Sequence, residues 1–501
     1  MTDAPLKLFN SLTRRHEVFA PVHPGEARVY TCGPTVYNYP HIGNMRAYVF
    51  ADVLGRTLSW KGYKLTHVIN ITDVGHLTDD ADAGEDKMEK MAAEKAQKGE
   101  ATSIWDIAEH YKQAYWADVR ALNIREPAQW TVATDYVAQM IAFAQGIADK
   151  HCYELESGLY FDVSTVADYG RLARAVTEDG EGRIESVEGK RNAADFAIWR
   201  KTPPGETRQM EWDSPWGRGA PGWHLECSVM SGEVLGFPFD IHTGGIDHRE
   251  IHHPNEIAQN QAHCCTNGLD DPKNSGAKIW MHNNFLVERS GKMSKSSGEF
   301  LRLQLLVDKG YHPLAYRLMC LQAHYRSELE FSWEGLGAAL TRLKRMVMGV
   351  ETLRARLPGA GRDPAHLGPG LRRGDDWGKL QPALDKFDAA IADDLNTAVA
   401  LTALDDVLAA KKVDPETKAK LAAAMDGVLG LDLLNLTRAD LRIQPKAATI
   451  TEAEITAALA RRKEARTAKD FATSDAIRDE LAAQGVEVMD GDPLGWEWKL
   501  S

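Results

Sequence analysis

The start of the chain has the pattern of a strand, a loop, a helix and a second strand. Residues 27–33 (ARVYTCG) and 64–72 (KLTHVINIT) are short runs with the character of buried strands. Between them, large apolar residues recur at helical spacing from Ile42 to Leu58. Two strands joined by a helix in this way predict a parallel sheet. We therefore expect an α/β fold with a Rossmann-type sheet, whose ligands bind beyond the carboxyl ends of the strands.

The sheet is expected to resume after an insertion and then to give way to helices. Strand character returns at 239–245 and 278–287, after helical and loop-rich patterns. The first domain is therefore expected to span 1–300, with an insertion at about 102–215. Amphipathic helical patterns dominate beyond it, and the chain ends in a pattern typical of two strands. The regions expected after the first domain are a connecting region, a helical bundle and a small mixed domain, at 301–350, 351–445 and 446–501.

Composition narrows the class of protein. The chain has 501 residues, six cysteines and a formal net charge of −13. This length needs several hydrophobic cores, and so few scattered cysteines favour metal binding or burial over a disulfide framework. The net charge disfavours a nucleic-acid partner, and the basic run 461–469, taken alone, is a solvated helix face. Because no apolar stretch of about 18 residues is present, we expect a cytoplasmic protein with no membrane partner.

The first candidate site lies at the start of the predicted helix. His41, Ile42, Gly43 and Asn44 open this helix soon after the first strand. A glycine there lets a nucleotide approach the backbone, and an imidazole at a helix N-terminus can donate to phosphate oxygens as charge develops. The alternative is that His41 only caps the helix, and four residues alone favour that alternative.

A second candidate site lies in a loop near residue 295. Residues 290–298 (SGKMSKSSG) combine glycines and serines with Lys292 and Lys295. Lysine is a compact charge on a flexible stem, so two of them can follow a pyrophosphate as it leaves. Taken alone, the segment is equally a solvated basic turn. Taken with His41, it resembles the HIGH and KMSKS signatures of class I aminoacyl-tRNA synthetases, with Asn44 in place of the final histidine.

A third group has the ligand types that zinc prefers. Cys32 ends the first strand, Cys227 lies in the segment PGWHLECS, and His252 and Glu256 are four residues apart on one helix face. Their spacing is unlike that of a zinc finger. The chain is similar to the cysteinyl-tRNA synthetase family, in which these four positions hold a zinc ion in the amino-acid pocket. Further similar segments are NITD, HTGGIDH, HYRSELEFS, DDLNTAVAL and KDFATSDAIRDEL, at 70–73, 242–248, 324–332, 393–401 and 469–481.

The resemblance implies ATP-dependent activation of L-cysteine and its transfer to the 3′ end of tRNA(Cys). One zinc ion per chain would favour cysteine over serine through a bond to the thiolate, and Mg²⁺ would accompany ATP. The catalytic residues would be His41, Asn44, Lys292 and Lys295. The ATP contacts would come from Gly43, Thr72, Gly245, Asp247 and Lys295, and the cysteine contacts from Cys32, Thr72 and Trp223. The metal ligands would be Cys32, Cys227, His252 and Glu256.

The resemblance also assigns the later regions to the tRNA. The connecting region 301–350 would contact the acceptor stem, and the domain 446–501 would recognise the anticodon. There Trp496 and Trp498 offer faces for unstacked bases, although both are equally suited to a core. We expect a monomer.

The chain departs from the family pattern in the metal segment. It reads DHREIHHPNE, where the family usually has an apolar residue and proline before the histidines and an acidic residue at Pro254. The ligands are kept, but contacts around them are expected to differ. We expect His253 and Asn255 beside the ligands or facing solvent. Three further histidines either donate hydrogen bonds in the site or lie on the surface: His242, His248 and His282.

Two rival functions follow from the same residues. A related ligase makes cysteinyl adenylate but passes it to an amino sugar, and such enzymes lack a region like 350–501. A catalytically silent paralogue would bind RNA or zinc for regulation, but it would have no reason to keep His41, both loop lysines and all four ligand types. The acidic segment 74–100 carries no assigned function.

Overall fold

The computed structural model describes most of the chain. The residues described are 4–74, 92, 103–173, 189–288, 301–357, 377–490, 492 and 494–500. The predicted lysine loop, with Lys292 and Lys295, lies outside them, and so does nearly all of the acidic segment 74–100. None of the helices in this described part has the length and hydropathy needed to cross a membrane.

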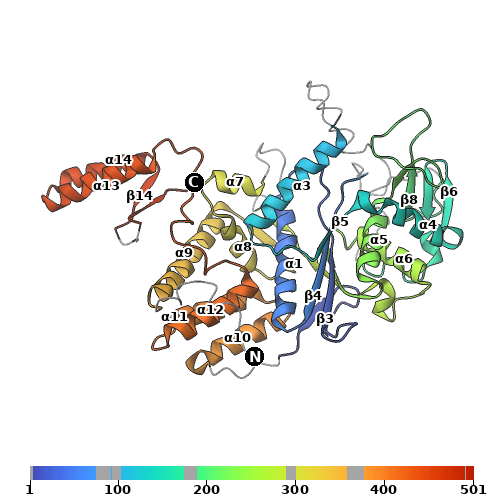
Figure 1. Ribbon diagram of the computed structural model, residues 1–501, viewed down its shortest axis with the longest axis horizontal. Coiled ribbons are helices and arrows are strands. Elements are labelled where there is room, and N and C mark those ends of the chain that lie inside the picture. The colour runs from blue at the N-terminus through green and yellow to red at the C-terminus, as the bar shows by residue number, and fades with distance from the viewer. Residues whose placement is uncertain are drawn as a thin grey trace.

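A five-stranded sheet forms the centre of the first half of the molecule (Figure 1). Its strand order is β11-β10-β3-β4-β5, and every pairing is parallel. The strands are β3 (Glu26–Thr31), β4 (Lys64–Ile71), β5 (Gln129–Val132), β10 (Phe239–Gly245) and β11 (Ala277–Asn283). The predicted parallel sheet is confirmed. Since β3 is central, its carboxyl end meets those of β10 and β4, where ligands bind in such sheets.

Helix α1 (Ile42–Trp60) crosses from β3 to β4 and is buried along most of its length. It packs against the sheet and against helices of the second half of the chain. This burial on several sides explains why its apolar residues extend around the helix. The helix predicted to begin near His41 is confirmed, and His41 is its N-cap.

A second sheet is formed by the part of the chain between β5 and β10, which is the next strand of the central sheet. Its order is β6-β7-β8-β9, and every pairing is antiparallel. The strands are β6 (Cys152–Leu155), β7 (Gly158–Phe161), β8 (Phe196–Lys201) and β9 (Gly219–Pro221), and the preceding helices are α3 (Ile104–Ala121) and α4 (Val137–His151). The range 102–215 predicted for the insertion therefore includes β5, a strand of the central sheet.

Two helices frame β10. Helix α5 (Trp223–Leu235) precedes this strand, and α6 (His252–Cys264) follows it. The two helices pack against each other and against α4 (Figure 1). Because α5 leads into β10 and α6 leads away from it, the start of each helix lies at the carboxyl edge of the sheet. The predicted site residues of both helices are therefore at that edge.

The second half of the chain is mainly helical, as predicted (Figure 1). Its helices are α7 (Leu303–Asp308), α8 (Pro313–Leu321), α9 (Trp333–Ala355), α10 (Gln381–Ala392), α11 (Thr397–Ala409) and α12 (Pro415–Leu429).

Two small strand pairs are β1 (Lys7–Asn10) with β2 (Arg15–Val18) and β12 (Leu286–Glu288) with β13 (Leu329–Phe331). Short 3₁₀ helices lie at Ala133–Tyr136, Val163–Thr165, Pro272–Ser275 and Gly378–Leu380.

Arg317 ties the helical half to the first. Its side chain is fully buried and donates to Asp52 of α1 at 2.5 Å and to the carbonyl oxygens of Leu122 and Leu429 at 3.0 and 2.8 Å. These contacts join α1, the end of α3, α8 and the end of α12. A buried guanidinium needs such partners, so the cluster holds these helices in one arrangement.

The C-terminal region has its own small core and lies at one end of the molecule (Figure 1). It comprises α13 (Glu452–Thr467), α14 (Phe471–Ala483), β14 (Val486–Val488) and β15 (Trp496–Trp498), and the two strands pair antiparallel, as predicted. Trp496 and Trp498 are 3% and 2% exposed and meet edge to face in this core. Their interpretation as faces for unstacked bases is therefore wrong, and their alternative role in a core is confirmed.

Candidate active site

The helix N-terminus at His41 combines a cap with a hydrogen-bond donor. The Nδ1 atom of His41 accepts from the backbone N–H of Gly43 at 3.0 Å, and the Asn44 side chain accepts from the backbone N–H of His41 at 3.1 Å. Burial lowers the pKa of His41 to about 4, so the ring is neutral at pH 7. Because Nδ1 accepts, the ring proton is on Nε2. His41 therefore caps the helix in its neutral form, with the ring proton on Nε2.

Two predicted ATP and substrate contacts lie close to this turn. Gly43 packs beside Leu286, where an added Cβ would be 3.6 Å from the leucine Cβ. Thr72 lies just beyond β4 and pairs with Thr35 in the loop before α1. Its hydroxyl donates to Glu226 at 3.0 Å and accepts from Asn70 at 3.1 Å. Thr72 thus fastens the loop to α5.

The end of β10 supplies two further predicted residues. Gly245 is the last residue of the strand, and Asp247 follows it with an exposed side chain. A Cβ at Gly245 would lie 2.3 Å from the Asp247 carboxylate. The glycine therefore lets that carboxylate fold back over the strand end.

The four predicted metal ligands come together in a buried group. One ligand atom from each of Cys32, Cys227, His252 and Glu256 lies within 4.8 Å of all the others. Their side chains come from the end of β3, the second turn of α5 and the first two turns of α6. Each residue is at most 6% exposed. The structure thus brings together residues more than 200 positions apart in the chain.

The protonation states in this group are set by its members. A hydrogen bond from Cys32 lowers the pKa of Cys227 to about 6, and burial raises the pKa of Cys32 well above its usual value. Burial opposes charge on the other two residues, but Glu256 raises the pKa of His252 to about 10, and His242 and His252 lower the pKa of Glu256 to about 2. A thiolate, an imidazolium and a carboxylate therefore lie next to one protonated thiol at pH 7.

Two further histidines, His224 and His242, form hydrogen bonds with two of these ligands. Nδ1 of His252 lies 2.9 Å from Nδ1 of His224, while its Nε2 lies 3.0 Å from Glu256. His252 therefore donates its Nδ1–H to His224 and turns Nε2 toward the other ligands. His242 Nε2 lies 2.8 Å from the second oxygen of Glu256. Such partners fix the ring orientation and tautomer of a metal-binding histidine.

A second group of four donors overlaps the first. It consists of Cys32, His242, His253 and Glu256 and satisfies the same 4.8 Å limit. His253 is fully buried, with Nε2 3.3 Å from the Cys32 sulfur and Nδ1 2.8 Å from His282. The alternative that His253 faces solvent is wrong, as is the surface alternative for His242 and His282.

Trp223 borders this group. Its ring centroid lies 4.4 Å from that of His252 and 6.3 Å from that of His248. Trp223 is the first residue of α5, so it lies at the same edge of the sheet as the donors. Trp223 therefore lies next to the predicted metal ligand His252.

Comparisons with known proteins address the family. A family model for the class I (C) catalytic domain of tRNA synthetases matches residues 18–341, and a model for the cysteinyl-tRNA ligase anticodon binding domain matches residues 451–493. The cysteine–tRNA ligase of Novosphingobium aromaticivorans is 78% identical over 99% of this chain and 98% of its own length. That of Zymomonas mobilis is 53% identical over the same shares. The chain belongs to the cysteine–tRNA ligase family.

The resemblance to the cysteinyl-tRNA synthetase family is thereby confirmed, and the chain is an aminoacyl-tRNA ligase with a class I catalytic domain. Solved structures support the fold. A leucyl-tRNA synthetase of Agrobacterium radiobacter aligns with a TM-score of 0.53 over 83% of this chain and 84% of that chain, at 12% identity. A methionyl-tRNA synthetase of Mycobacterium tuberculosis aligns with a TM-score of 0.51 over 80% and 88%, also at 12% identity.

One residue that holds a ligand of this cysteine–tRNA ligase site, His224, is not among those predicted from the sequence. His242 and His253, for which the sequence left both a place in the site and a place at the surface open, lie in the site, where His242 holds Glu256 and His253 offers a donor of its own. A signal was available for His224, which lies three residues before Cys227 and therefore near it on the helix. No comparable signal separates His253 from its neighbour His252.

Proposed function

We propose that this chain activates L-cysteine with ATP to form cysteinyl adenylate and transfers the cysteinyl group to the 3′-terminal adenosine of tRNA(Cys). The observation that carries this proposal is the buried group of two sulfurs, an imidazole and a carboxylate at the carboxyl ends of the strands. The His41 turn, which can donate to phosphate, starts from the same edge. An amino acid held at the metal group and a nucleotide held at this turn would therefore be neighbours.

The donor set fits zinc. Cys32, Cys227, His252 and Glu256 are the ligand types that Zn²⁺ takes, and their atoms are close enough together to share one ion. When bound, Zn²⁺ would supply a Lewis acid that favours the thiolate of cysteine over the hydroxyl of serine. His224 and His242 would hold the ligands in place, and Trp223 would limit the space for the side chain. Selection by that bond needs no separate editing site.

The nucleotide would lie at the start of α1. His41 would donate its Nε2–H to the α-phosphate, and Gly43 would leave room for the nucleotide next to the backbone. Mg²⁺ would accompany the ATP. Asn44, Gly245, Asp247 and Thr72 would complete the site, and the two loop lysines would stabilise the departing pyrophosphate. Attack by the cysteine carboxylate is in line with the leaving group, so positioning is the main contribution of these residues.

The C-terminal domain would read the anticodon with an exposed aromatic residue. Phe471 is 62% exposed and follows the exposed cation Lys469 by two residues, and Lys463 is a further exposed cation of the same domain. Arg462 and Arg466 form ion pairs with Asp490, at 2.8 and 3.0 Å. An exposed ring near cations suits an unstacked base with its phosphate. We infer further that the enzyme acts as a monomer in the cytoplasm.

Charging of a tRNA(Cys) transcript tests this assignment. Cysteine should be attached to tRNA(Cys) but not to a tRNA(Ser) transcript. The Phe471→Ala variant should lose about 5- to 150-fold in kcat/KM for tRNA(Cys), because base stacking on an aromatic ring contributes about 1–3 kcal/mol. Its tRNA-independent ATP–pyrophosphate exchange should be unchanged. Val18→Ala, at a residue that is 57% exposed in β2, is the matched control.

If protein that still exchanges pyrophosphate charges neither transcript, the proposed transfer step is refuted. An equal loss of charging and of pyrophosphate exchange in Phe471→Ala would refute a role of Phe471 that is confined to tRNA binding.

A further inference from the structure

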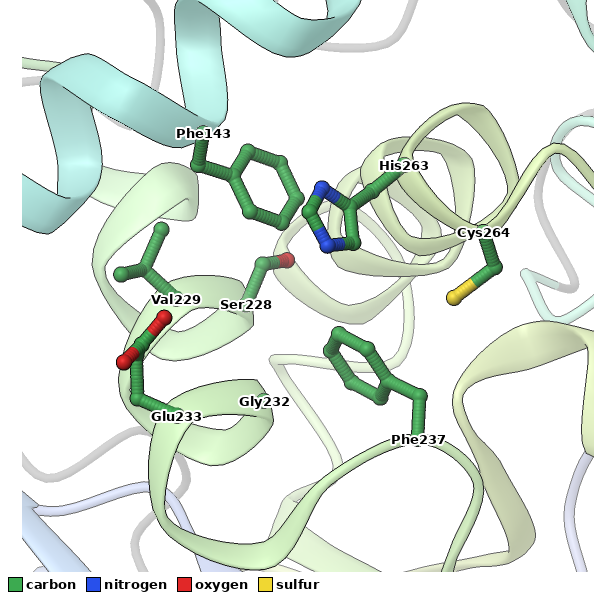
Figure 2. Close-up of a pocket in the computed structure, with 8 residues that line it drawn as sticks. All are labelled: Phe143, Ser228, Val229, Gly232, Glu233, Phe237, His263 and Cys264. Atoms are coloured by element: carbon green, nitrogen blue, oxygen red, sulfur yellow. The ribbon is translucent and has the colours of Figure 1, made fainter.

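A cavity lies beside the C-terminal halves of α5 and α6, the two helices that carry three of the predicted metal ligands (Figure 2). Its volume is about 320 Å³, and side chains from α4, the last turns of α5, the end of α6 and the loop after α5 line it. None of the predicted site residues is among them. From Cys227 to Gly232 and from Glu256 to His263 the helices rise about 8 and 10 Å. Ser228, next to Cys227, is the lining residue closest in the chain to a predicted ligand, and the rest of the lining lies further along the two helices.

Aromatic rings form its walls. Phe143 and His263 stack with their centroids 4.2 Å apart and their planes at 8°, and Phe237 lies edge-on to His263 at 6.2 Å. Figure 2 shows these three rings around the space, with the Ser228 hydroxyl between them. A Cβ at Gly232 would be 2.6 Å from the Phe237 ring. The glycine thus lets this ring pack against α5.

The charge around the cavity is negative. Among the described residues that line it, Glu233 carries the only formal charge, and no ion pair to it is found in the described part of the chain. Partial desolvation lowers the pKa of His263 and raises the pKa of Cys264, so both side chains are neutral. Helices α5 and α6 also end here, and their C-terminal carbonyl groups add partial negative charge.

We propose that this cavity binds a small organic cation, a primary ammonium group on an apolar body. The ammonium would pair with Glu233, and the apolar body would pack on Phe143 and Phe237, whose ring faces also attract a cation. The volume lies at the lower end of the range for small-molecule sites, about 300–1,000 Å³. A neutral ligand of the same shape would lack the charge pairing.

Benzylammonium and its neutral counterpart benzyl alcohol test this proposal. Calorimetric titration of the full-length protein at pH 7 and low salt should give saturable binding of benzylammonium and at least tenfold weaker binding of the alcohol. The Glu233→Gln variant should lose at least tenfold in affinity for benzylammonium. Glu233 is exposed, so this variant should fold normally, and Asp270→Asn, at another exposed carboxylate, should bind like the wild type.

Alkylation of Cys264 gives a second readout. Bound benzylammonium should slow the reaction of Cys264 with iodoacetamide, while the exposed neighbour Cys265 serves as an internal reference. Equal affinity for the amine and the alcohol, or unchanged affinity in Glu233→Gln, would overturn the proposal. So would the absence of saturable binding to the wild-type protein.

Discussion

Zinc binding to the four-donor site should become much tighter as pH rises. At pH 7.5 Cys32 is protonated, because burial raises its pKa well above the usual value, and His252, with a pKa of about 10, is protonated too. Both must lose a proton before they can bind an ion. Cys227 and Glu256, with pKa values of about 6 and 2, are already deprotonated. Each ion bound should therefore release two protons.

The size of the effect follows from this count. Protons compete with the ion for the same atoms, so each released proton raises the association constant tenfold per pH unit. Two protons give about 100-fold, or about 2.7 kcal/mol, per pH unit between pH 7 and 9. Below pH 6 Cys227 also becomes protonated, so the dependence steepens there.

Calorimetry can count these protons directly. Zinc is titrated into chelator-treated protein at pH 7.5 in two buffers with different ionisation enthalpies, and the difference in heat gives the number of protons released. We expect about two for the wild type, one for His252→Gln, and two for the control Cys152→Ser, whose sulfur lies outside the donor group. Release of no proton or of one by the wild type would refute the protonation states derived for Cys32 and His252.

Three further outcomes are expected. His224→Ala should weaken zinc binding about 10- to 100-fold in chelator competition, since the Nδ1–H of His252 loses its acceptor; unchanged affinity would argue against that contact. Arg317→Met should lower the free energy of unfolding by about 3–5 kcal/mol in urea, because Asp52 loses one of its buried partners; a loss under 1 kcal/mol would contradict this. Lys295→Ala should slow adenylate formation about 100-fold or more in single-turnover assays with little change in cysteine affinity, and equal losses would exclude a transition-state role.

The sequence predicts the central sheet well because its local patterns are strong. Residues 64–72 read as a strand, and β4 spans Lys64–Ile71, while the prediction 239–245 coincides with β10. The periodicity between Ile42 and Leu58 predicts α1 in the same way. Such patterns depend on burial along each element and need no knowledge of distant contacts.

The metal group could not be predicted from local pattern alone. Cys32, Cys227 and His252 lie in three separate elements, and only the order of strands in the sheet brings them together. Their grouping in the sequence came from the resemblance to a family. The burial of His242 is equally hidden, since a parallel strand covered on both faces shows no alternation of polar and apolar residues.

The sequence does contain a pattern that argues against Trp496 and Trp498 as exposed faces for bases. Trp496 and Trp498 are two residues apart in a strand, so they share one face, while Glu497 points to the other. Both rings lie in the small core of this region. Glu497 forms ion pairs with Lys344 and Arg438 instead.

The central claim is that cysteine is activated at a zinc-dependent site. Its most direct test is cysteine-dependent ATP–pyrophosphate exchange without tRNA, with serine as the control, before and after removal of the metal by a chelator. The account predicts exchange with cysteine only, its loss after chelation and its return when zinc is added back. Exchange with cysteine that survives complete removal of the metal, with serine still rejected, would contradict the role assigned to Cys32, Cys227, His252 and Glu256.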